Sequence, residues 1–108
     1  GDSRTVLSRL GTAIDMSKDH KPNRPDEKAR IEQAGGHVSG KGIPRVSGLL
    51  ATSRTFGDGS MKAPNVKRVC IIAEPEVTVW DVRAPLPLVR IVSGTECGGV
   101  ANSDLSWG

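Results

Sequence analysis

The sequence is poor in aromatic residues: its 108 residues include one Phe, two Trp and no Tyr. Aromatic side chains bury the most area each. Their scarcity therefore limits the core, to which only 36% of the residues can contribute as hydrophobic side chains. Thirteen Gly and seven Pro interrupt regular structure. This composition predicts one small domain, or part of one, built from strands and loops with little helix.

Cysteine is also scarce. Cys70 and Cys97 lie far apart and belong to no Cys-x-x-Cys or paired-His motif, which argues against a zinc site. A disulfide between them stays open on spacing alone, but the composition is not that of a disulfide scaffold. We therefore expect a reducing compartment, the cytoplasm or the nucleus. A start at Gly1 without a Met is typical of a fragment or a processed chain.

Long apolar runs and clustered charges are missing too. No stretch approaches the roughly 20 apolar residues of a membrane helix, so we expect no membrane contact. The net charge is +3 and the isoelectric point is about 9.2. Lys and Arg are scattered among acids and no aromatics accompany them, so nucleic acid is not an expected partner.

Local patterns predict a few short elements in the first third of the chain. Residues 5–7 are β-prone, and residues 11–14 are expected to complete a hairpin after a turn. Pro25 suits the first position of a helix, where its missing N–H costs nothing. We expect this helix to run to about Ala34 and to end at Gly35-Gly36.

Further along, glycine and proline dominate the pattern. Residues 38–45 are glycine-rich and are expected to form an exposed flap. Residues 46–51 are expected to form a short buried strand, and the alternating valines of residues 77–82 predict a half-buried strand. Residues 86–92 are another candidate strand, weakened by two prolines.

One segment nearly spells a phosphate-binding loop. In residues 35–42, Gly42 stands where that motif needs Ser or Thr, and the expected helix precedes the loop instead of following it. A helix end followed by a flexible turn is the favoured interpretation. His20 and His37 have no partners in a recognisable catalytic triad, and we expect no chemical role for them.

Several acids could hold a hard cation such as Mg²⁺, whose preferred ligands are oxygens. The candidates are Asp2, Asp58 and the pair Glu74 and Glu76. Acids beside Gly, Ser or Pro are more often turn formers. Composition and spacing alone therefore indicate only a strand-rich domain.

The order of short motifs carries more information. They are Gly1-Asp2-Ser3-Arg4, Ser17-Lys18-Asp19-His20-Lys21-Pro22, Glu27-x-x-Arg30-Ile31, Ala34-Gly35-Gly36-x-Val38, Arg45-Val46-x-Gly48-x-Leu50-Ala51-Thr52-Ser53-Arg54-x-Phe56-Gly57-Asp58 followed by Lys62, and Glu74-Pro75-Glu76-Val77. This succession resembles the type 2C (PPM) metal-dependent protein serine/threonine phosphatases, and especially their plant members. The resemblance covers residues 1 to about 79.

The resemblance implies an α+β fold, namely a fragment of a four-layer α-β-β-α sandwich. It implies hydrolysis of phosphoserine and phosphothreonine proteins by a water activated between two Mg²⁺ or Mn²⁺ ions. Asp2 matches the aspartate that ligates a third, weaker ion. Arg4, Arg54 and Asp58 match positions that we take as structural, and residues 38–45 match a flap beside the active site. No position of this chain matches a catalytic residue of the family.

The match is good over residues 1–82 and degenerate over residues 83–108. An ungapped placement puts Gly94 and Gly98 where the family carries two metal-binding aspartates. A frameshifted or mis-spliced tail after Val82 is the competing explanation. Either way most metal ligands are missing, which implies an inactive phosphatase as this incomplete chain.

Two alternatives stay open. The chain could be a binding module of the pseudophosphatase type that holds a phosphoprotein or a regulator. It could instead be a truncated product without function that self-associates through unpaired sheet edges.

Overall fold

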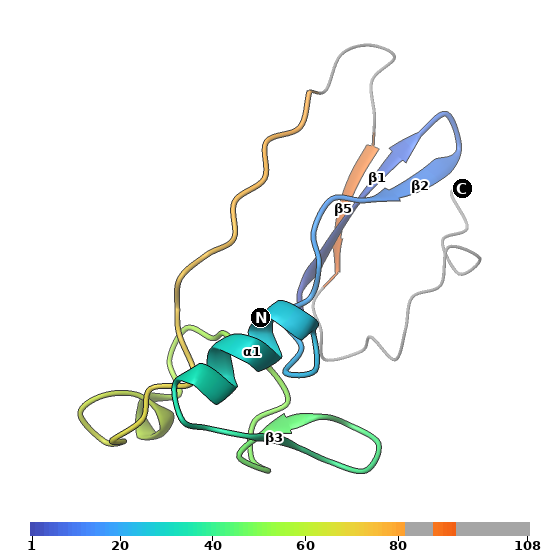
Figure 1. Ribbon diagram of the computed structural model, residues 1–108. Helices are drawn as coiled ribbons and strands as arrows, with labels where there is room; N and C mark the ends of the chain where they lie inside the picture. Colours follow the sequence, from blue (N-terminus) through green and yellow to red (C-terminus); the bar gives the residue numbers. More distant parts are fainter. Residues whose placement is uncertain (82–87, 93–108) are drawn as a thin grey trace. The chain divides into compact units, whose positions relative to one another are not determined.

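The computed structural model describes residues 1–81 in full and the backbone of residues 88–92 (Figure 1). The elements in chain order are β1 (Arg4–Arg9), β2 (Thr12–Asp15), α1 (Pro25–Gln33), β3 (Val38–Ser39), β4 (Arg45–Val46), the 3₁₀ turn η1 (Gly59–Met61) and β5 (Leu88–Val92). They fall into two compact units. Unit 1 comprises Gly1 and His20–Pro75, and unit 2 comprises Asp2–Asp19 with the described residues from Glu76 on. No helix within the described residues is long and apolar enough to cross a membrane.

Unit 2 is built on an antiparallel hairpin. β1 pairs with β2 in a register that runs from Val6 opposite Asp15 to Arg9 opposite Thr12. Leu10 and Gly11 connect the strands with φ angles of 51° and 77°. A two-residue turn with positive φ at both positions matches the right-handed twist of the flanking strands. The hairpin predicted from residues 5–14 is confirmed.

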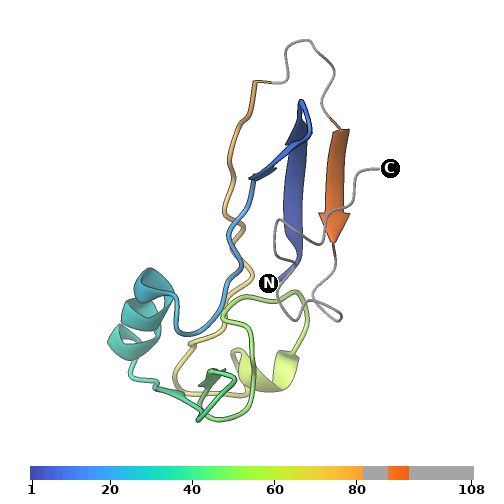
Figure 2. The ribbon, with the colours of Figure 1, turned by 90° about the vertical axis from the view of Figure 1, so that its right-hand side faces the viewer.

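The third strand of this sheet comes from far along the sequence. β5 pairs antiparallel with the other edge of β1, with Arg4 opposite Val92 and Ser8 opposite Leu88 (Figure 2). The sheet order is therefore β2-β1-β5. The strand predicted over residues 86–92 is confirmed over residues 88–92, and residues 86 and 87 lie outside the described part of the chain. Both Val6 and Leu7 are buried, although successive strand residues point to opposite faces, so β1 is covered on both faces.

The strand predicted over residues 77–82 is wrong for its described part, residues 77–81, and Val82 lies outside the described residues. Val77 and Val79 are 77% and 95% exposed, so neither side chain packs against an apolar surface in the described part of the structure. Thr78 Oγ1 donates to the Met16 carbonyl at 3.2 Å, a side-chain hydrogen bond where a strand would form backbone hydrogen bonds.

Unit 1 carries the helix, and α1 begins and ends where the sequence predicts. Pro25 is its first residue, and Gly35 follows its end with a φ of 86°. The Gly36 N–H donates to the Ile31 carbonyl and the Gly35 N–H to the Glu32 carbonyl, both at 2.9 Å. These two bonds form a Schellman motif, which satisfies carbonyls at the helix end.

The flap of residues 38–45 is a minimal hairpin. β3 and β4 pair over two residues each, Val38 with Val46 and Ser39 with Arg45. The buried strand predicted over residues 46–51 is wrong, because Ser47 and Gly48 adopt φ angles of 52° and 71° and reverse the chain directly after Val46. Leu50 then returns to bridge to Val46.

The core of unit 1 is small. Its buried members come from the helix, the flap and the segment after the η1 turn: Ile31, Val46, Cys70 and Ile71. Ala34, Val38, Leu50 and Met61 pack against them with partial exposure. Helix and flap thus share one apolar cluster.

Gly36 is the residue at which this core tolerates no added atom. A Cβ there would collide with the Cys70 Sγ and lie 3.1 Å from the Ile31 Cγ2. We expect Gly36→Ala to lower the free energy of unfolding by about 1–3 kcal/mol, the usual effect of overpacking.

The matched control for Gly36 is Gly59→Ala, because a Cβ at Gly59 meets nothing within 4 Å. Urea denaturation followed by circular dichroism measures both variants. Equal stabilities for the two would contradict this packing.

Candidate functional site

The most buried charge in the described residues is Glu27, in the first turn of α1, which is 1% exposed. It lies one turn before Ile31, and residues four apart share a helix face. Because Ile31 faces the core, the side chain of Glu27, on the same face of α1, also lies in the interior. A buried carboxylate is stable only when it is paired and hydrogen-bonded.

Arg54 supplies the first pairing. Its Nη2 donates to the Glu27 Oε1 at 2.6 Å, and its Nε donates to the Glu27 Oε2 at 3.1 Å. This two-point contact between a planar guanidinium and a carboxylate is the strongest form of such a pair.

Two further donors reach the Glu27 Oε2. Arg30 Nη2 donates at 3.0 Å, and Ser53 Oγ donates at 2.5 Å. We call Glu27, Arg30, Ser53 and Arg54 the Glu27 cluster.

The cluster also binds backbone carbonyls of unit 1. Arg54 Nη1 donates to the Glu74 carbonyl at 3.1 Å, and Arg30 Nη1 donates to the Cys70 carbonyl at 2.8 Å. The Ser53 N–H donates to the His20 carbonyl at 2.8 Å, and the Ser53 Oγ, whose one proton goes to Glu27, lies 3.0 Å from the same oxygen. One carboxylate therefore connects α1 with three segments that the sequence separates widely.

The electrostatics keep Glu27 ionised. Burial opposes the charged form and by itself raises the pKa, but the hydrogen bonds from Arg54, Arg30 and Ser53 outweigh it, so the pKa of Glu27 lies well below its ordinary value. The neighbouring Asp26 is exposed, and its pKa falls to about 2, first of all through hydrogen bonds from Arg24.

This arrangement is typical of a structural ion pair and not of a catalytic or metal-binding site. Both carboxylate oxygens of Glu27 already accept from protein donors, and the side chain is shielded from solvent. The carboxylate is therefore held by protein donors and is not presented to a cation or a substrate in solution. Arg54, expected from the sequence to be structural, has that role here.

The metal ligand predicted from the sequence, Asp2, is half-buried and directly precedes the residues that lead into β1. Within residues 1–81, no group of three or more His, Cys, Asp or Glu side chains comes together to hold a metal. Magnesium is held by carboxylate oxygens together with water, and the described residues gather no such group of acids, so by themselves they do not form the metal centre that the resemblance implies. The role of Asp2 stays a prediction.

Two other motif residues take structural positions. Arg4 donates through Nε and Nη2 to the two carboxylate oxygens of Asp19, each at 3.0 Å. Asp58 adopts a φ of 49° and its carbonyl accepts from the Met61 N–H at 2.9 Å, so it forms the η1 turn. Both agree with the sequence-based interpretation.

Both histidines accept hydrogen bonds through their backbone carbonyls, and the His20 Nδ1 also lies 3.1 Å from the amino group of Gly1. The carbonyl of His20 accepts from Ser53, and the carbonyl of His37 accepts from the Ser47 N–H at 2.9 Å. Burial, followed by nearby positive charges, lowers the pKa of the His20 imidazole.

Sequence reasoning missed the importance of Glu27 and Ser53. In the sequence, Glu27 stands out only as part of the motif Glu27-x-x-Arg30-Ile31, and Ser53 only as part of the longer motif of residues 45–58. The available signal was the spacing Glu27-x-x-Arg30, because residues three apart on a helix can pair.

A sequence model of the family described as Protein phosphatase 2C matches residues 1–84. Among curated proteins, the chain is 54% identical over 81 residues to "Probable protein phosphatase 2C 8" of Oryza sativa subsp. japonica, which covers 75% of this chain. It is 48% identical over 105 residues to "Probable protein phosphatase 2C 75" of Arabidopsis thaliana, which covers 97% of this chain. This chain therefore belongs to the protein phosphatase 2C family.

Solved structures agree. A crystal structure of a phosphatase from a pathogenic strain of Toxoplasma gondii matches with a TM-score of 0.56 and 42% identity, over 84% of this chain and 25% of that chain. The predicted α+β class, a fragment of the PPM-type phosphatase fold, is confirmed. The chain spans only 19% and 22% of the length of the rice and Arabidopsis relatives.

Removing the charge of Glu27 should destabilise unit 1. Glu27→Gln leaves two guanidinium groups without their carboxylate, and we expect the free energy of unfolding at pH 7 to fall by about 3 kcal/mol. Because the folded pKa of Glu27 lies below its ordinary value of 4.5, its contribution is present above pH 4.5 and is lost as the pH falls.

The stability gap between the wild type and Glu27→Gln should therefore narrow between pH 5 and pH 3 in urea denaturation. Asp26→Asn is the control: its exposed ion pair should change stability by less than about 0.5 kcal/mol. A stability difference that stays constant between pH 5 and pH 3 would contradict the stabilising role of the Glu27 charge.

Proposed function

We propose that this chain is a scaffold segment of a metal-dependent protein serine/threonine phosphatase and does not hydrolyse phosphoesters alone. The observation that carries the proposal is the family match over residues 1–84, combined with a chain that spans about a fifth of its relatives. Phosphoserine and phosphothreonine proteins are the proposed substrates of the whole enzyme, and Mg²⁺ or Mn²⁺ its proposed cofactor. The cytoplasm or the nucleus is its proposed location.

The chemistry supports the division between scaffold and catalysis. Activation of a water for attack on phosphorus needs cations held by several carboxylates. Among the described residues, only Asp2 is proposed as such a ligand, and no cluster of potential ligands surrounds it. What the described residues supply is positioning: the Glu27 cluster, the flap and the hairpin.

A chimera tests the proposal. The 81 matched residues of the rice relative are replaced by the corresponding residues of this chain, and phosphate release from a phosphothreonine peptide is measured with Mn²⁺. We expect the chimera to keep activity within about tenfold of the rice protein, because 54% of these positions are already identical.

The chain alone, in the same assay, should release no phosphate above a protein-free control. A folded chimera without activity contradicts the family function, and turnover by the chain alone contradicts the assignment as a scaffold.

Asp2 can be tested in the same chimera. Loss of an outer-sphere partner already weakens metal sites 10- to 100-fold, so loss of a direct ligand should cost at least about tenfold in metal affinity. We expect Asp2→Asn to raise the Mn²⁺ concentration for half-maximal activity by that factor.

The control for Asp2 is Asp58→Asn, since Asp58 is exposed and lies in the η1 turn. An unchanged Mn²⁺ titration for Asp2→Asn would remove Asp2 from the proposed site.

A second candidate function is a binding module that holds a phosphoprotein or a regulator without hydrolysis. The flap favours it, because Lys41 is exposed and Ile43 is 64% exposed beside it. Pull-down with the wild type and with Ile43→Ser discriminates: a partner retained equally by both, or by neither, counts against this candidate.

A further inference from the structure

Positive charge is concentrated in the second half of unit 1. Residues 33–73 contain one acid, Asp58, and six basic residues: Lys41, Arg45, Arg54, Lys62, Lys67 and Arg68. Arg54 is neutralised by Glu27. The pairing is different near the start of the chain, where Arg4, Arg24 and Lys28 each face a carboxylate.

Three of the remaining cations are held by neutral carbonyl oxygens. Lys62 Nζ donates to the Thr55 carbonyl at 2.6 Å, and Arg68 Nη1 donates to the Gly35 carbonyl at 2.7 Å. Arg45 Nη1 donates to the Leu49 carbonyl at 2.7 Å. Such bonds fix the direction of a side chain but do not cancel its unit charge, so the positive potential stays at the surface.

Lys62, Lys67 and Arg68 belong to one loop, and we call them the loop cation cluster. The loop reverses between Lys62 and Asn65, where the Asn65 N–H donates to the Lys62 carbonyl at 2.9 Å. The Asn65 Nδ2 closes it further by donating to the Gly59 carbonyl at 2.8 Å. The shape of the loop is thus set by its own bonds before any partner arrives.

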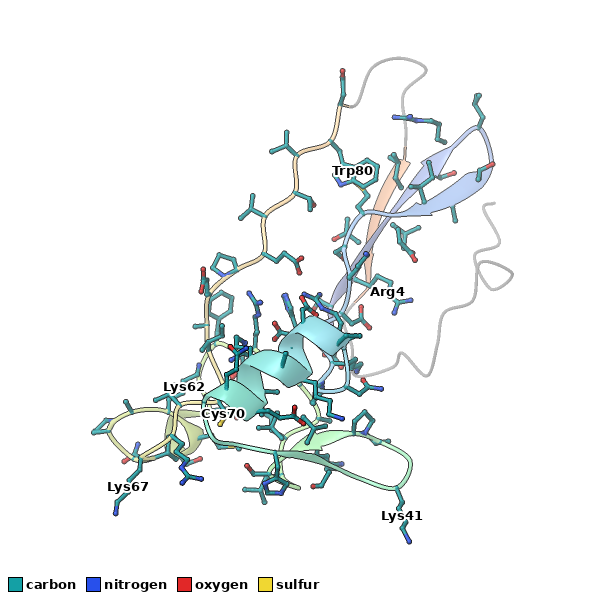
Figure 3. The ribbon with its side chains drawn as sticks, in the orientation of Figure 1. Arg4, Lys41, Lys62, Lys67, Cys70 and Trp80 are labelled. Atoms are coloured by element: carbon teal, nitrogen blue, oxygen red, sulfur yellow. The ribbon has the colours of Figure 1, made fainter. Side chains whose placement is uncertain are left out.

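Lys67 is the open member of this cluster. It is exposed and makes no hydrogen bond or ion pair within the described residues. Figure 3 shows Lys62 and Lys67 on the same loop, with Lys41 separate at the far end of the flap. Lys41 is equally exposed, so it offers the same charge at a different place in the same unit.

We propose that the loop cation cluster docks an acidic segment of a partner protein. Three cations lie within residues 62–68 of one loop, and their positive charge is complementary to the negative charge of a short run of carboxylates. The pre-set loop also lowers the conformational cost of binding. Nucleic acid fits less well, because one exposed aromatic residue, Phe56, precedes the loop and residues 57–68 contain no further aromatic side chain on which successive bases could stack. This docking requires neither hydrolysis nor a metal, and it therefore goes beyond the proposed phosphatase function.

The test is fluorescence anisotropy with the 108-residue chain. The probe is a fluorescein-labelled peptide with six consecutive glutamates, and a peptide with six glutamines is the reference. We expect the glutamate peptide to bind at least tenfold more tightly at 50 mM NaCl, and this advantage to shrink at 500 mM NaCl, where surface charges are screened.

Two variants with the same change in net charge locate the binding surface. Lys67→Glu should raise the dissociation constant about tenfold, whereas Lys41→Glu should change it less than about twofold. Thermal melts verify that both variants are folded, and Lys67→Gln repeats the test with a milder change.

If Lys67→Glu and Lys41→Glu weaken binding of the glutamate peptide equally, the peptide is attracted to the net charge of the chain and not to the loop cation cluster. That result would overturn the proposal. No preference for glutamate over glutamine would also overturn it. So would tighter binding of a 12-nucleotide single-stranded DNA than of the glutamate peptide.

Discussion

The structure of unit 1 depends on one buried carboxylate. Glu27 accepts hydrogen bonds from Arg30, Ser53 and Arg54, and the same three residues also donate to backbone carbonyls at positions 20, 70 and 74. A buried charge costs several kcal/mol in lost hydration, which only such complete pairing offsets. Loss of one donor would leave the rest of the cluster poorly solvated, so its members act together.

The composition explains this reliance on polar contacts. Phe56 and Trp80, the aromatic residues that the structure describes, are 88% and 37% exposed, so neither fills a core. Ile31, Val46 and Ile71 form the apolar centre together with the small Cys70. Few large apolar side chains mean a modest gain from burial. The Glu27 cluster joins segments that are distant in the sequence and so fixes an arrangement that the small hydrophobic core does not fix alone.

The features predicted correctly from the sequence are those with local causes. Pro25 and Gly35 set the ends of α1, and the turn at Leu10 and Gly11 sets the hairpin. The strand predicted at 46–51 and the described part of the one predicted at 77–82 are wrong, because strand formation depends on a neighbouring strand and a surface to cover, which apolar alternation does not reveal. The same limit hid the Glu27 cluster: an acid in a first helical turn is usually solvated, and its burial depends on Arg54 from another part of the chain.

The central position of β1 also has a consequence for synthesis. Its partner β2 follows within a few residues, but β5 begins at Leu88, almost eighty residues after β1 ends. At ribosomal rates of about 5–20 residues per second, that interval lasts roughly 4–16 s. During this time the edge of β1 that β5 later covers has no partner among the described residues, and its backbone groups can pair with another strand. Protection of that edge until Leu88 follows, for instance by a chaperone, would prevent such pairing.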